Sequence, residues 1–513
     1  MKSLEVFELT YRIRAISRKY KIKLTSHRQN SFEKGIEWLK KHITLDSSIG
    51  NSQSSKMSDK ELMGYFVSTL YNIGEKNLSF ELAKRQASLQ RPDGSFISHE
   101  VPCTFSTSQV IDGFLTVLDD MPELKENLIR ACNFLESQIT EEGKVMNVSC
   151  INTEAWNEDE LPEYAYLHVL PPLLKAGKNL NQEKYVIAAL RSRDYFLKKE
   201  DPIEFKPSMN SHVFGYIIQA LVDLGDAEFA RQVLKQVVTL QRVDGAIPAY
   251  PGVDWVFSMG MAQLAIAFYK LGWREPADKA MAYLEKRQNR SGGFYGSYGR
   301  GAKHLRKEES GLALKFYLDA YMLMMKSAFE EVGILEKIEE RDGRVQEILT
   351  FLDDLNGKKV LDVGCGKGRY LRLLTKRFPN AQYFGMDVSW ELLRFCPKEV
   401  KTSVGTMLAM KYPDSYFDCV LCIEALEHAV NTEAAIKEMV RALKPGGKII
   451  IIDKNAAKLG KMKIMPWERW FSPQQITTLL GKYGVTARHK ETAYEHLSKP
   501  DGLFVAWKGI KKS

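Results

Sequence analysis

The stretch Val-Leu-Asp-Val-Gly-Cys-Gly-Lys-Gly occupies residues 360–368, and a helix-like segment, 369–378, follows it at once. The apolar residues at its start predict a short strand, and the alternating glycines after them predict a turn. Glycine is needed where the backbone takes a positive φ or approaches a ligand closely. A helix that begins behind such a turn presents free N–H groups to an anionic group. The pattern predicts a strand, a turn and a helix that together hold a nucleotide-like cofactor.

The segments after this turn continue the alternation of strands and helices. Residues 381–387 form a second candidate strand that ends at Asp387, 21 positions after Gly366. In doubly wound sheets, an acid at about this distance accepts hydrogen bonds from ribose hydroxyls. The remaining candidate strands lie at 400–406, 419–423, 448–453, 485–494 and 502–508, with helices at 432–443 and 473–483 and a Lys-Pro-Gly-Gly turn at 444–447. This order predicts an α/β, Rossmann-like sheet of seven strands.

This ordered series resembles the class I S-adenosylmethionine-dependent methyltransferases, particularly the ubiquinone/menaquinone-biosynthesis type, over about residues 358–509. Dehydrogenases also combine a parallel sheet with a glycine turn. They are disfavoured because Asp362 precedes the first glycine by two residues, the Leu-Lys-Pro-Gly-Gly segment has no counterpart in the dinucleotide fingerprint, and only one mononucleotide-like half is present. The resemblance implies S-adenosyl-L-methionine as the cofactor and methyl transfer as the reaction.

The resemblance also implies roles for single residues. The glycines would wrap the amino-acid part of the cofactor, Asp362 would orient their loop, and Asp387 would hold the ribose. Where the family often has an acid after the third strand, this chain has Gly-Thr-Met at 405–407, which departs from the usual adenine contact. The expected cofactor-binding residues are Asp362, Gly364, Cys365, Gly366, Gly368, Asp387, Val388, Thr406, Met407 and Glu424.

Glu427 and His428 follow the fourth strand, at the sheet edge where open α/β folds bind ligands. An imidazole suits proton abstraction from a hydroxyl, because its unperturbed pKa is about 6.5. Methyl transfer from a sulfonium can also proceed mainly by alignment, so a packing role for His428 stays open. We predict Glu427 and His428 as catalytic residues and expect no metal ligands; Cys419 and Cys422 are interpreted as core residues.

The segment 454–471 would cover the methyl acceptor. It carries four lysines and Arg469 against a single acid, Glu468, and aromatic residues stand near its end. This character fits an anionic glycan, a phosphorylated lipid or a membrane surface, while a solvated loop with packed aromatics is the alternative. The acceptor-contacting residues expected here are Trp467, Arg469 and Trp470.

The first two-thirds of the chain shows helical periodicity with a recurring turn. Gln-Arg-Pro-Asp-Gly-Ser-Phe at 90–96 recurs as Gln-Arg-Val-Asp-Gly-Ala-Ile at 241–247, and more loosely as Gln-Asn-Arg-Ser-Gly-Gly-Phe at 288–294. About six helix pairs fit between residues 31 and 329. The region resembles the α/α toroid domains of terpenoid cyclases and protein prenyltransferases. We therefore expect a multidomain protein with an all-α (α/α)6 toroid at 1–329, a helical linker at 330–355 and a class I methyltransferase domain at 356–513.

The toroid lacks the acid motif of the hopene-forming cyclases and a clear match to the zinc ligands of the prenyltransferases. We expect it to bind the acceptor, with Trp156, Asp254 and Trp255 as candidate contacts, since aromatic faces stack on sugar rings. A second enzyme activity in the toroid, a lyase or cyclase, stays open. A scaffold with a vestigial transferase is disfavoured by the complete glycine loop and Asp387.

Whole-chain features set wider limits. The net charge of +9 allows anionic partners, and seven scattered cysteines argue for a reducing cytoplasm rather than a disulfide framework. The basic stretch 1–23 lacks the apolar core of a signal peptide, and we expect no membrane span. Nucleic acid is disfavoured, because the chain has neither an Asn-Pro-Pro-aromatic motif nor a long basic tract.

Together these features predict a cytoplasmic O-methyltransferase, with peripheral contact to the inner membrane surface left open. Its expected acceptor is a polysaccharide precursor or a lipid-linked sugar. A small lipid or quinone-type acceptor is the alternative.

Overall fold

The computed structural model describes residues 31–44, 48–49, 59–98, 101–146, 163–302, 305–331, 333–461, 465, 467–493 and 500–513. These residues divide into two compact units. The helical unit contains the described residues up to Ser327 except Asn72–Gly74, and the sheet unit contains those three residues and Ala328–Ser513.

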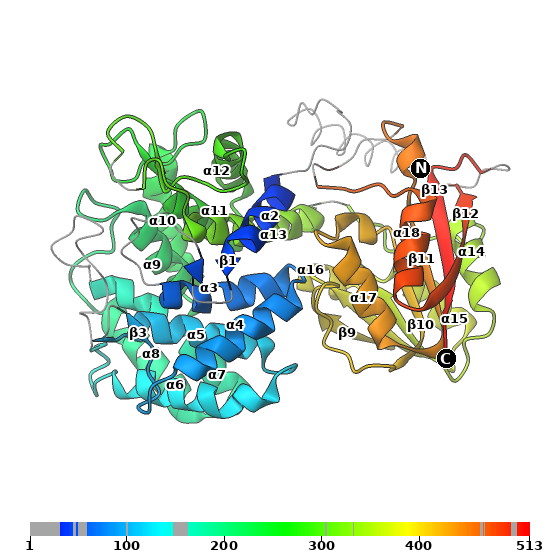
Figure 1. Cartoon of the computed structure of the whole chain (residues 1–513), viewed down its shortest axis with the longest axis horizontal. Helices are drawn as coiled ribbons and strands as arrows, with labels where there is room; N and C mark the ends of the chain where they lie inside the picture. The colour runs from blue at the N-terminus through cyan, green and yellow to red at the C-terminus, as the bar shows by residue number, and fades with distance from the viewer. Residues whose placement is uncertain are drawn as a thin grey trace. The chain divides into compact units, whose positions relative to one another are not determined.

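The helical unit alternates helices with turns (Figure 1). Its helices are α2 (Ser31–His42), α3 (Asp59–Asn72), α4 (Lys76–Leu89), α5 (Thr104–Val117), η1 (Pro122–Leu124), α6 (Lys125–Ser137), η3 (Glu163–Val169), α7 (Leu170–Leu180), α8 (Glu183–Leu197), α9 (Ser211–Asp223), α10 (Ala227–Leu240), α11 (Ser258–Lys270), α12 (Arg274–Arg287) and α13 (Gly311–Glu331), whose last residues belong to the sheet unit. Three antiparallel pairs of short strands lie in the connections: β1 (Ile43–Thr44) with β2 (Ser48–Ile49), β3 (Ile97–Ser98) with β4 (Val101–Pro102), and β5 (Val256–Phe257) with β6 (Ser297–Tyr298).

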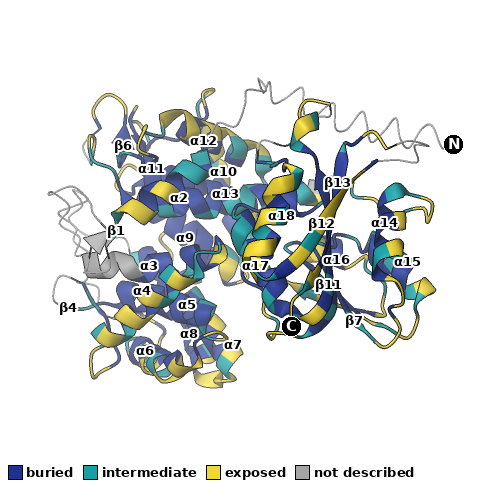
Figure 2. Ribbon diagram, turned by 45° about the vertical axis from the view of Figure 1, so that its right-hand side comes forward, coloured by how far each residue is buried: buried dark blue, intermediate teal, exposed yellow. Residues whose placement is uncertain are grey.

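Two kinds of helix alternate along this unit. In α5, α9 and α11 nearly every residue is buried, whereas α4, α10 and α12 bury one face and expose the other (Figure 2). A helix that is buried on all sides must be surrounded by other elements. The unit therefore has an inner and an outer set of helices, and the helical character predicted for this region is confirmed.

The recurring turns share one hydrogen-bonding geometry. The side-chain amides of Gln90, Gln241 and Gln288 each donate to the carbonyl of the glycine four residues later, at 3.1, 3.1 and 2.9 Å. Each amide also donates to a carbonyl in the first turn of another helix. These acceptors are Asn127 of α6, Pro276 of α12 and Ser31 of α2, at 2.8, 2.9 and 2.7 Å. The third turn thus binds the first described helix of the unit.

The sheet unit has the seven-stranded sheet that the sequence predicts. Its elements are α14 (Gly343–Leu352), β7 (Lys359–Val363), α15 (Arg369–Arg377), β8 (Gln382–Asp387), α16 (Trp390–Leu393), β9 (Val400–Val404), β10 (Phe417–Ile423), η4 (Leu426–His428), α17 (Thr432–Ala442), β11 (Leu443–Lys454), η5 (Ala456–Lys458), α18 (Pro473–Lys482), β12 (Val485–Thr492) and β13 (Phe504–Lys511). The strand order is β12-β13-β11-β10-β7-β8-β9, and β13 runs antiparallel to both of its neighbours. The other four pairings are parallel.

The strand order reverses between β7 and β10, which are neighbours in the sheet. In open α/β sheets, ligands bind outside the carboxyl ends of the strands at such a reversal. The core behind it is apolar: residues 449–452 of β11 are completely buried isoleucines, and Cys419 and Cys422 of β10 are buried, as interpreted from the sequence.

The described part of the expected linker, residues 330–355, contains the end of α13 and the whole of α14. Val345, Ile348 and Leu352 of α14 are buried in the core of the sheet unit. These residues therefore contribute to the sheet unit directly. Among the described residues, every helix is too short or too polar to cross a membrane.

We expect Gly245→Ala to destabilise the helical unit strongly. The added Cβ would lie 2.1 Å from the carbonyl oxygen of Lys279, and φ at this position is +92°. Clash and backbone strain together should lower the free energy of unfolding by about 3 kcal/mol or more.

Gly225→Ala is the matched control, because φ is +101° there and no atom lies within 4 Å of the added Cβ. This substitution should lower the free energy of unfolding only by the backbone strain, about 1–2 kcal/mol. Urea unfolding followed by circular dichroism compares the two variants, and equal losses would contradict a close approach of the turn to α12.

Candidate cofactor and acceptor site

The glycine loop joins the ends of β7 and β8. The N–H groups of Gly364 and Cys365 donate to the carbonyl of Met386 at 2.8 and 3.0 Å. Gly364 has a φ of +73°, and a Cβ there would meet the Cβ of Ala425 at 2.5 Å, so a larger residue would displace the loop. The side chain of Met407 also lies over Gly364. The structure thus brings Met407 and the glycine loop together.

Asp387 holds this loop with its carboxylate. One oxygen accepts from the N–H of Gly366 at 2.8 Å, and the other accepts from the N–H of Ser389 at 3.0 Å. Burial raises the pKa of Asp387 above its usual value, while these backbone donors oppose the rise. Val388, beside it, is partly buried. Asp387 therefore shapes the loop through both of its carboxylate oxygens.

Asp362 is the buried acid at the end of β7. The residue is 1% exposed, and among the described residues none donates a hydrogen bond to its Oδ2 atom. Burial raises the pKa of Asp362 to about 7, although the nearby guanidinium of Arg369 lowers it. A buried carboxylate oxygen without a donor is unfavourable until a ligand supplies one. The ammonium of an amino-acid group has the matching charge and N–H donors, so the residues present fit the amino-acid part of S-adenosylmethionine.

Glu424 is engaged by protein groups. It has a φ of +54°, and its carboxylate accepts from Arg344, from Arg369 at 2.6 Å and from the hydroxyl of Tyr370 at 3.1 Å. Burial alone would raise the pKa of Glu424, but the two guanidiniums lower it below its usual value. Asp342 also binds Arg344, at 2.8 Å. Glu424 therefore anchors the end of β10 to the first turns of α14 and α15.

Thr406 and Cys365 make local contacts. The Thr406 hydroxyl accepts from the N–H of Leu408 at 3.2 Å, which shapes the turn after β9. The thiols of Cys365 and Cys396 lie 3.8 and 3.6 Å from the carbonyl oxygen of Gly366. These contacts position the backbone of the glycine loop and of the turn after β9.

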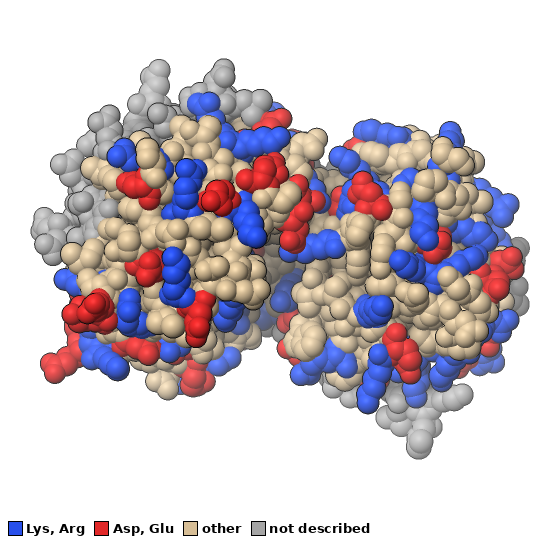
Figure 3. All heavy atoms as spheres, turned by 90° about the horizontal axis from the view of Figure 1, so that it is seen from below, with Lys and Arg blue, Asp and Glu red and all other residues tan. Residues whose placement is uncertain are grey.

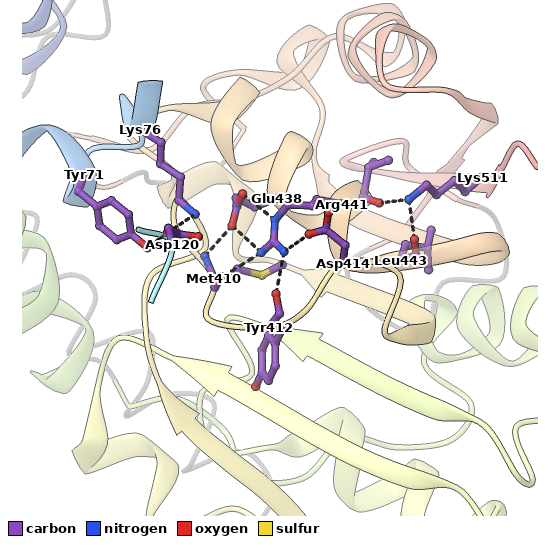
Figure 4. A network of polar contacts seen from close by, with 11 residues as sticks. Tyr71, Lys76, Asp120, Met410, Tyr412, Asp414, Glu438, Arg441, Leu443 and Lys511 are labelled. Atoms are coloured by element: carbon purple, nitrogen blue, oxygen red, sulfur yellow. Dashed lines mark hydrogen bonds and ion pairs between the residues drawn. The ribbon is translucent and has the colours of Figure 1, made fainter. Parts of the chain in front are cut away.

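Arg441 of α17 holds the segment that follows Met407 (Figure 4). Its guanidinium donates to the carbonyls of Met410 and Tyr412, at 2.9 and 2.7 Å, and to the carboxylate of Asp414 at 2.7 Å. Glu438 accepts from Arg441 at 3.0 Å and from the N–H of Met410 at 2.8 Å. A planar guanidinium with several fixed acceptors is an effective clamp for a loop.

Glu427 and His428 lie at the carboxyl end of β10, in η4. The Oε1 atom of Glu427 is 3.3 Å from Nε2 of His428, and its Oε2 atom is 2.6 Å from the ammonium of Lys454. Burial would raise the pKa of Glu427, but the charge of Lys454, the neighbouring His428 and hydrogen bonds together outweigh burial and bring the pKa to about 2. An ionised carboxylate only accepts, so neutral His428 carries its proton on Nε2. Its Nδ1 atom is buried and has no hydrogen-bond partner.

Aromatic side chains adjoin this pair. Phe329, in the last turn of α13, packs edge-on against the ring of His428 with centroids 4.7 Å apart, and against Trp467 at 6.3 Å. Trp467 and Trp470 are buried, and neither indole N–H has a partner. The N–H of Arg469 donates to the carbonyl of Glu427 at 2.9 Å, while its guanidinium donates to the carbonyl of Val430 at 2.8 Å. The structure thus brings Trp467 and Arg469 to the predicted catalytic pair.

Of the acceptor contacts expected in the first region, two lie in the described helical unit. Trp255 is buried and packs against Tyr250 and Phe257, with ring centroids 5.8 and 6.1 Å apart. Asp254 is exposed, and its backbone carbonyl accepts from Arg242 at 2.8 Å. Trp156 lies outside the described residues.

Sequence reasoning missed three residues that the geometry brings into the site. Arg344 stands in the segment interpreted as a linker, and Phe329 was placed at the end of the helical region. The sequence predicts Lys454 only as one of the basic residues in the segment 454–471 that would cover the methyl acceptor. The place of Lys454 at the carboxyl end of a central strand is the sequence feature that could have indicated its role in the site.

Comparison with known proteins shows what the C-terminal part of the chain resembles. Residues 361–451 match the family model of the methyltransferase domain. The ubiquinone biosynthesis O-methyltransferase of Idiomarina loihiensis is 38% identical over 121 residues, which cover 22% of this chain and 49% of that protein. The fatty-acid O-methyltransferase of Mycolicibacterium smegmatis is 31% identical over 121 residues, which cover 23% and 43%. A solved structure of a SAM-dependent methyltransferase from Aquifex aeolicus has 18% identity and a TM-score of 0.30, and the match covers 36% of this chain and 97% of that one.

The chain thus spans about half the length of the curated relatives that it matches. The C-terminal part of the chain carries a class I methyltransferase domain, and the cofactor of this domain is S-adenosylmethionine.

The affinity for S-adenosylmethionine should rise with pH. The carboxyl of Asp362 ionises only as the pH passes about 7, and its charged form attracts an ammonium. Below that pH, binding must release the proton, so the affinity should fall by up to about tenfold per pH unit. Isothermal titration calorimetry on either side of about pH 7 measures this.

Asp362→Asn is the control for this prediction, since it should weaken binding and remove the pH dependence. Because the folded-state pKa of Asp362 is raised, its stabilising contribution is lost as the pH rises through about 7. The ligand-free variant should therefore be more stable than the wild type above that pH. An affinity of the wild type that does not change with pH would argue against Asp362 as the ammonium contact.

Proposed function

We propose that the protein is an S-adenosylmethionine-dependent O-methyltransferase whose N-terminal helical unit recognises the acceptor. The observation that carries the proposal is the buried, donor-free Asp362 oxygen beside a complete glycine loop, within the segment that matches the methyltransferase-domain model. When bound, the cofactor supplies a methyl group activated by its sulfonium charge. Asp362, Asp387 and the glycine loop would bind and orient it, with Met407 over the loop.

The proton of the acceptor hydroxyl would pass to Nδ1 of His428. This atom carries the lone pair, because the Nε2 proton faces the carboxylate of Glu427 at 3.3 Å. Phe329 would exclude water from one side of the imidazole, since its ring packs against that of His428, and Trp467 packs in turn against Phe329. The pair therefore provides an oriented general base for an oxygen acceptor.

We propose that the helical unit is an α/α toroid. Its alternation of fully buried and half-buried helices supports this arrangement. The turn after α12 supports it further, because Gln288 binds Ser31 at the start of α2 and the glycine of that turn packs against Lys34 of the same helix. A contact between the last repeat and the first helix is what a closed ring of helix pairs requires.

Polar and aromatic groups at the inner helices support a sugar as the acceptor. The ring of Tyr216 lies 4.0 Å from that of His168 and 4.6 Å from that of His212, with Phe105 at 5.4 Å. Burial and the nearby Lys315 ammonium lower the pKa values of both histidines, so both are neutral imidazoles. Aromatic faces with imidazole and amide groups suit a sugar ring better than an isoprenoid chain.

We therefore propose a polysaccharide precursor or a lipid-linked sugar as the acceptor, methylated in the cytoplasm or at the inner membrane surface. A small lipid or quinone is the second candidate, because relatives of the C-terminal domain are named for ubiquinone and fatty-acid methylation. Acidic side chains are interspersed with the basic ones on the face drawn in Figure 3, which favours a small acceptor over nucleic acid.

Transfer from labelled cofactor tests this proposal. The wild type should label an oligosaccharide or lipid-linked sugar fraction in preference to quinones and fatty acids. His428→Asn should lower kcat by about a hundredfold, because it removes the proton acceptor, and should leave cofactor binding intact. His489→Gln is the matched control, since His489 is exposed on β12. Equal labelling by wild type and His428→Asn would contradict the role of the imidazole.

A further inference from the structure

Lys454 is a buried ammonium between two buried carboxylates. Its Nζ atom lies 2.6 Å from Oε2 of Glu427 and 3.1 Å from Oε2 of Glu468. The three side chains are 8%, 3% and 8% exposed, respectively. Charges removed from water in this way are stable only when they compensate one another. Lys454 is the last residue of β11, so the strand itself places the ammonium at the ligand-binding edge of the sheet.

The neighbouring acids leave Glu427 as the charged partner of Lys454. Asp453 accepts from the backbone N–H groups of Glu427 and Lys454, at 2.9 and 2.8 Å. Burial and the charge of Glu427 raise the pKa of Asp453 well above its usual value. The same two causes raise the pKa of Glu468. The cluster therefore places its negative charge on the carboxylate that faces His428.

A divalent cation is the alternative partner for these groups. Ligand atoms of Glu427, His428 and Glu468 lie within 4.8 Å of one another, which is a spacing that could hold an ion. The ammonium of Lys454 already contacts both carboxylates. A metal would have to displace it and would also take an imidazole nitrogen.

We propose that Lys454 is a positioning residue of the acceptor site: it keeps the Glu427 carboxylate charged, and through that carboxylate it fixes His428 in the tautomer that presents Nδ1 to the acceptor. The consequence for catalysis rests on the proposed function, but the tautomer itself does not. Besides Glu427, the groups that face His428 are the ring of Phe329 and the more distant carboxyls of Asp387 and Glu468.

Without the ammonium, the buried Glu427 carboxylate loses its charged partner and should take up a proton, so it no longer holds a proton on Nε2 of His428. Removal of Lys454 should therefore release His428 from the Nε2–H tautomer. An imidazole with its proton on Nδ1 has no lone pair there for the acceptor's proton, so kcat should fall by about tenfold. The KM for the cofactor should stay unchanged, because Asp362 and Asp387 are untouched.

Nitrogen NMR of the full-length protein labelled on its histidines tests this without an acceptor. Spectra of His428→Gln identify the signals of His428. The wild type should show the Nε2–H tautomer at neutral pH, and neither Mg²⁺ nor Zn²⁺ should change it. Lys454→Met should no longer show the Nε2–H tautomer as the dominant form of His428. Lys461→Met is the matched control, because Lys461 is exposed in the same connection, and should leave the spectrum unchanged.

Two further variants keep the test decisive if Lys454→Met fails to fold. Glu427→Gln should also lose the Nε2–H tautomer as the dominant form, whereas Glu468→Gln should retain it. An unchanged tautomer in Lys454→Met or Glu427→Gln would overturn the proposal. So would stoichiometric loss of the His428 signals when Zn²⁺ is added to the wild type. Failure of methyl transfer with every acceptor would contradict the proposed function and leave this result standing.

Discussion

The N–H group of Gly366 donates to the carboxylate of Asp387, and the shape of the cofactor site depends on this hydrogen bond. It joins the loop after β7 to the end of β8, where the carbonyl of Met386 already accepts two further N–H groups of the same loop. A loop fastened at three points holds its shape without a ligand, so little ordering remains for the binding step. The bond also fixes Asp387 itself, since its second oxygen is held by Ser389. The glycines allow this geometry because side chains there would collide with neighbouring segments.

Buried charge organises the rest of the sheet edge. Glu424 is matched by Arg344 and Arg369, and Glu427 is matched by Lys454. Such pairs add little net stability, but they hold side chains in one geometry because any misplacement leaves a charge unpaired. Asp362 differs from them, since one of its oxygens lacks a donor. Protein cations therefore neutralise Glu424 and Glu427, whereas Asp362 keeps one oxygen to which a cationic ligand group could donate.

The sequence was sufficient for the sheet, because its information is local. The central strands β7, β10 and β11 contain short apolar runs, glycine or proline turns lie next to them, and the glycine loop defines its own conformation. The recurring glutamine turns could also be recognised from their repeated sequence. The charged partners of Glu424 and Glu427 could not be predicted from local sequence. Arg344 is 80 residues from Glu424, and Lys454 belongs to another strand, so neither pairing follows from any local pattern. The contact of Phe329 with His428 could not be predicted for a related reason. The sequence of the last turn of a helix does not indicate which distant side chain a residue there will contact.

The central claim is that the C-terminal unit holds a working cofactor site built around Asp387. Calorimetry of the full-length protein with S-adenosylmethionine, beside an Asp387→Ala variant, tests it most directly. Micromolar binding by the wild type that is lost in the variant is the predicted result. Binding that survives the substitution, or no binding by the wild type, would contradict the account.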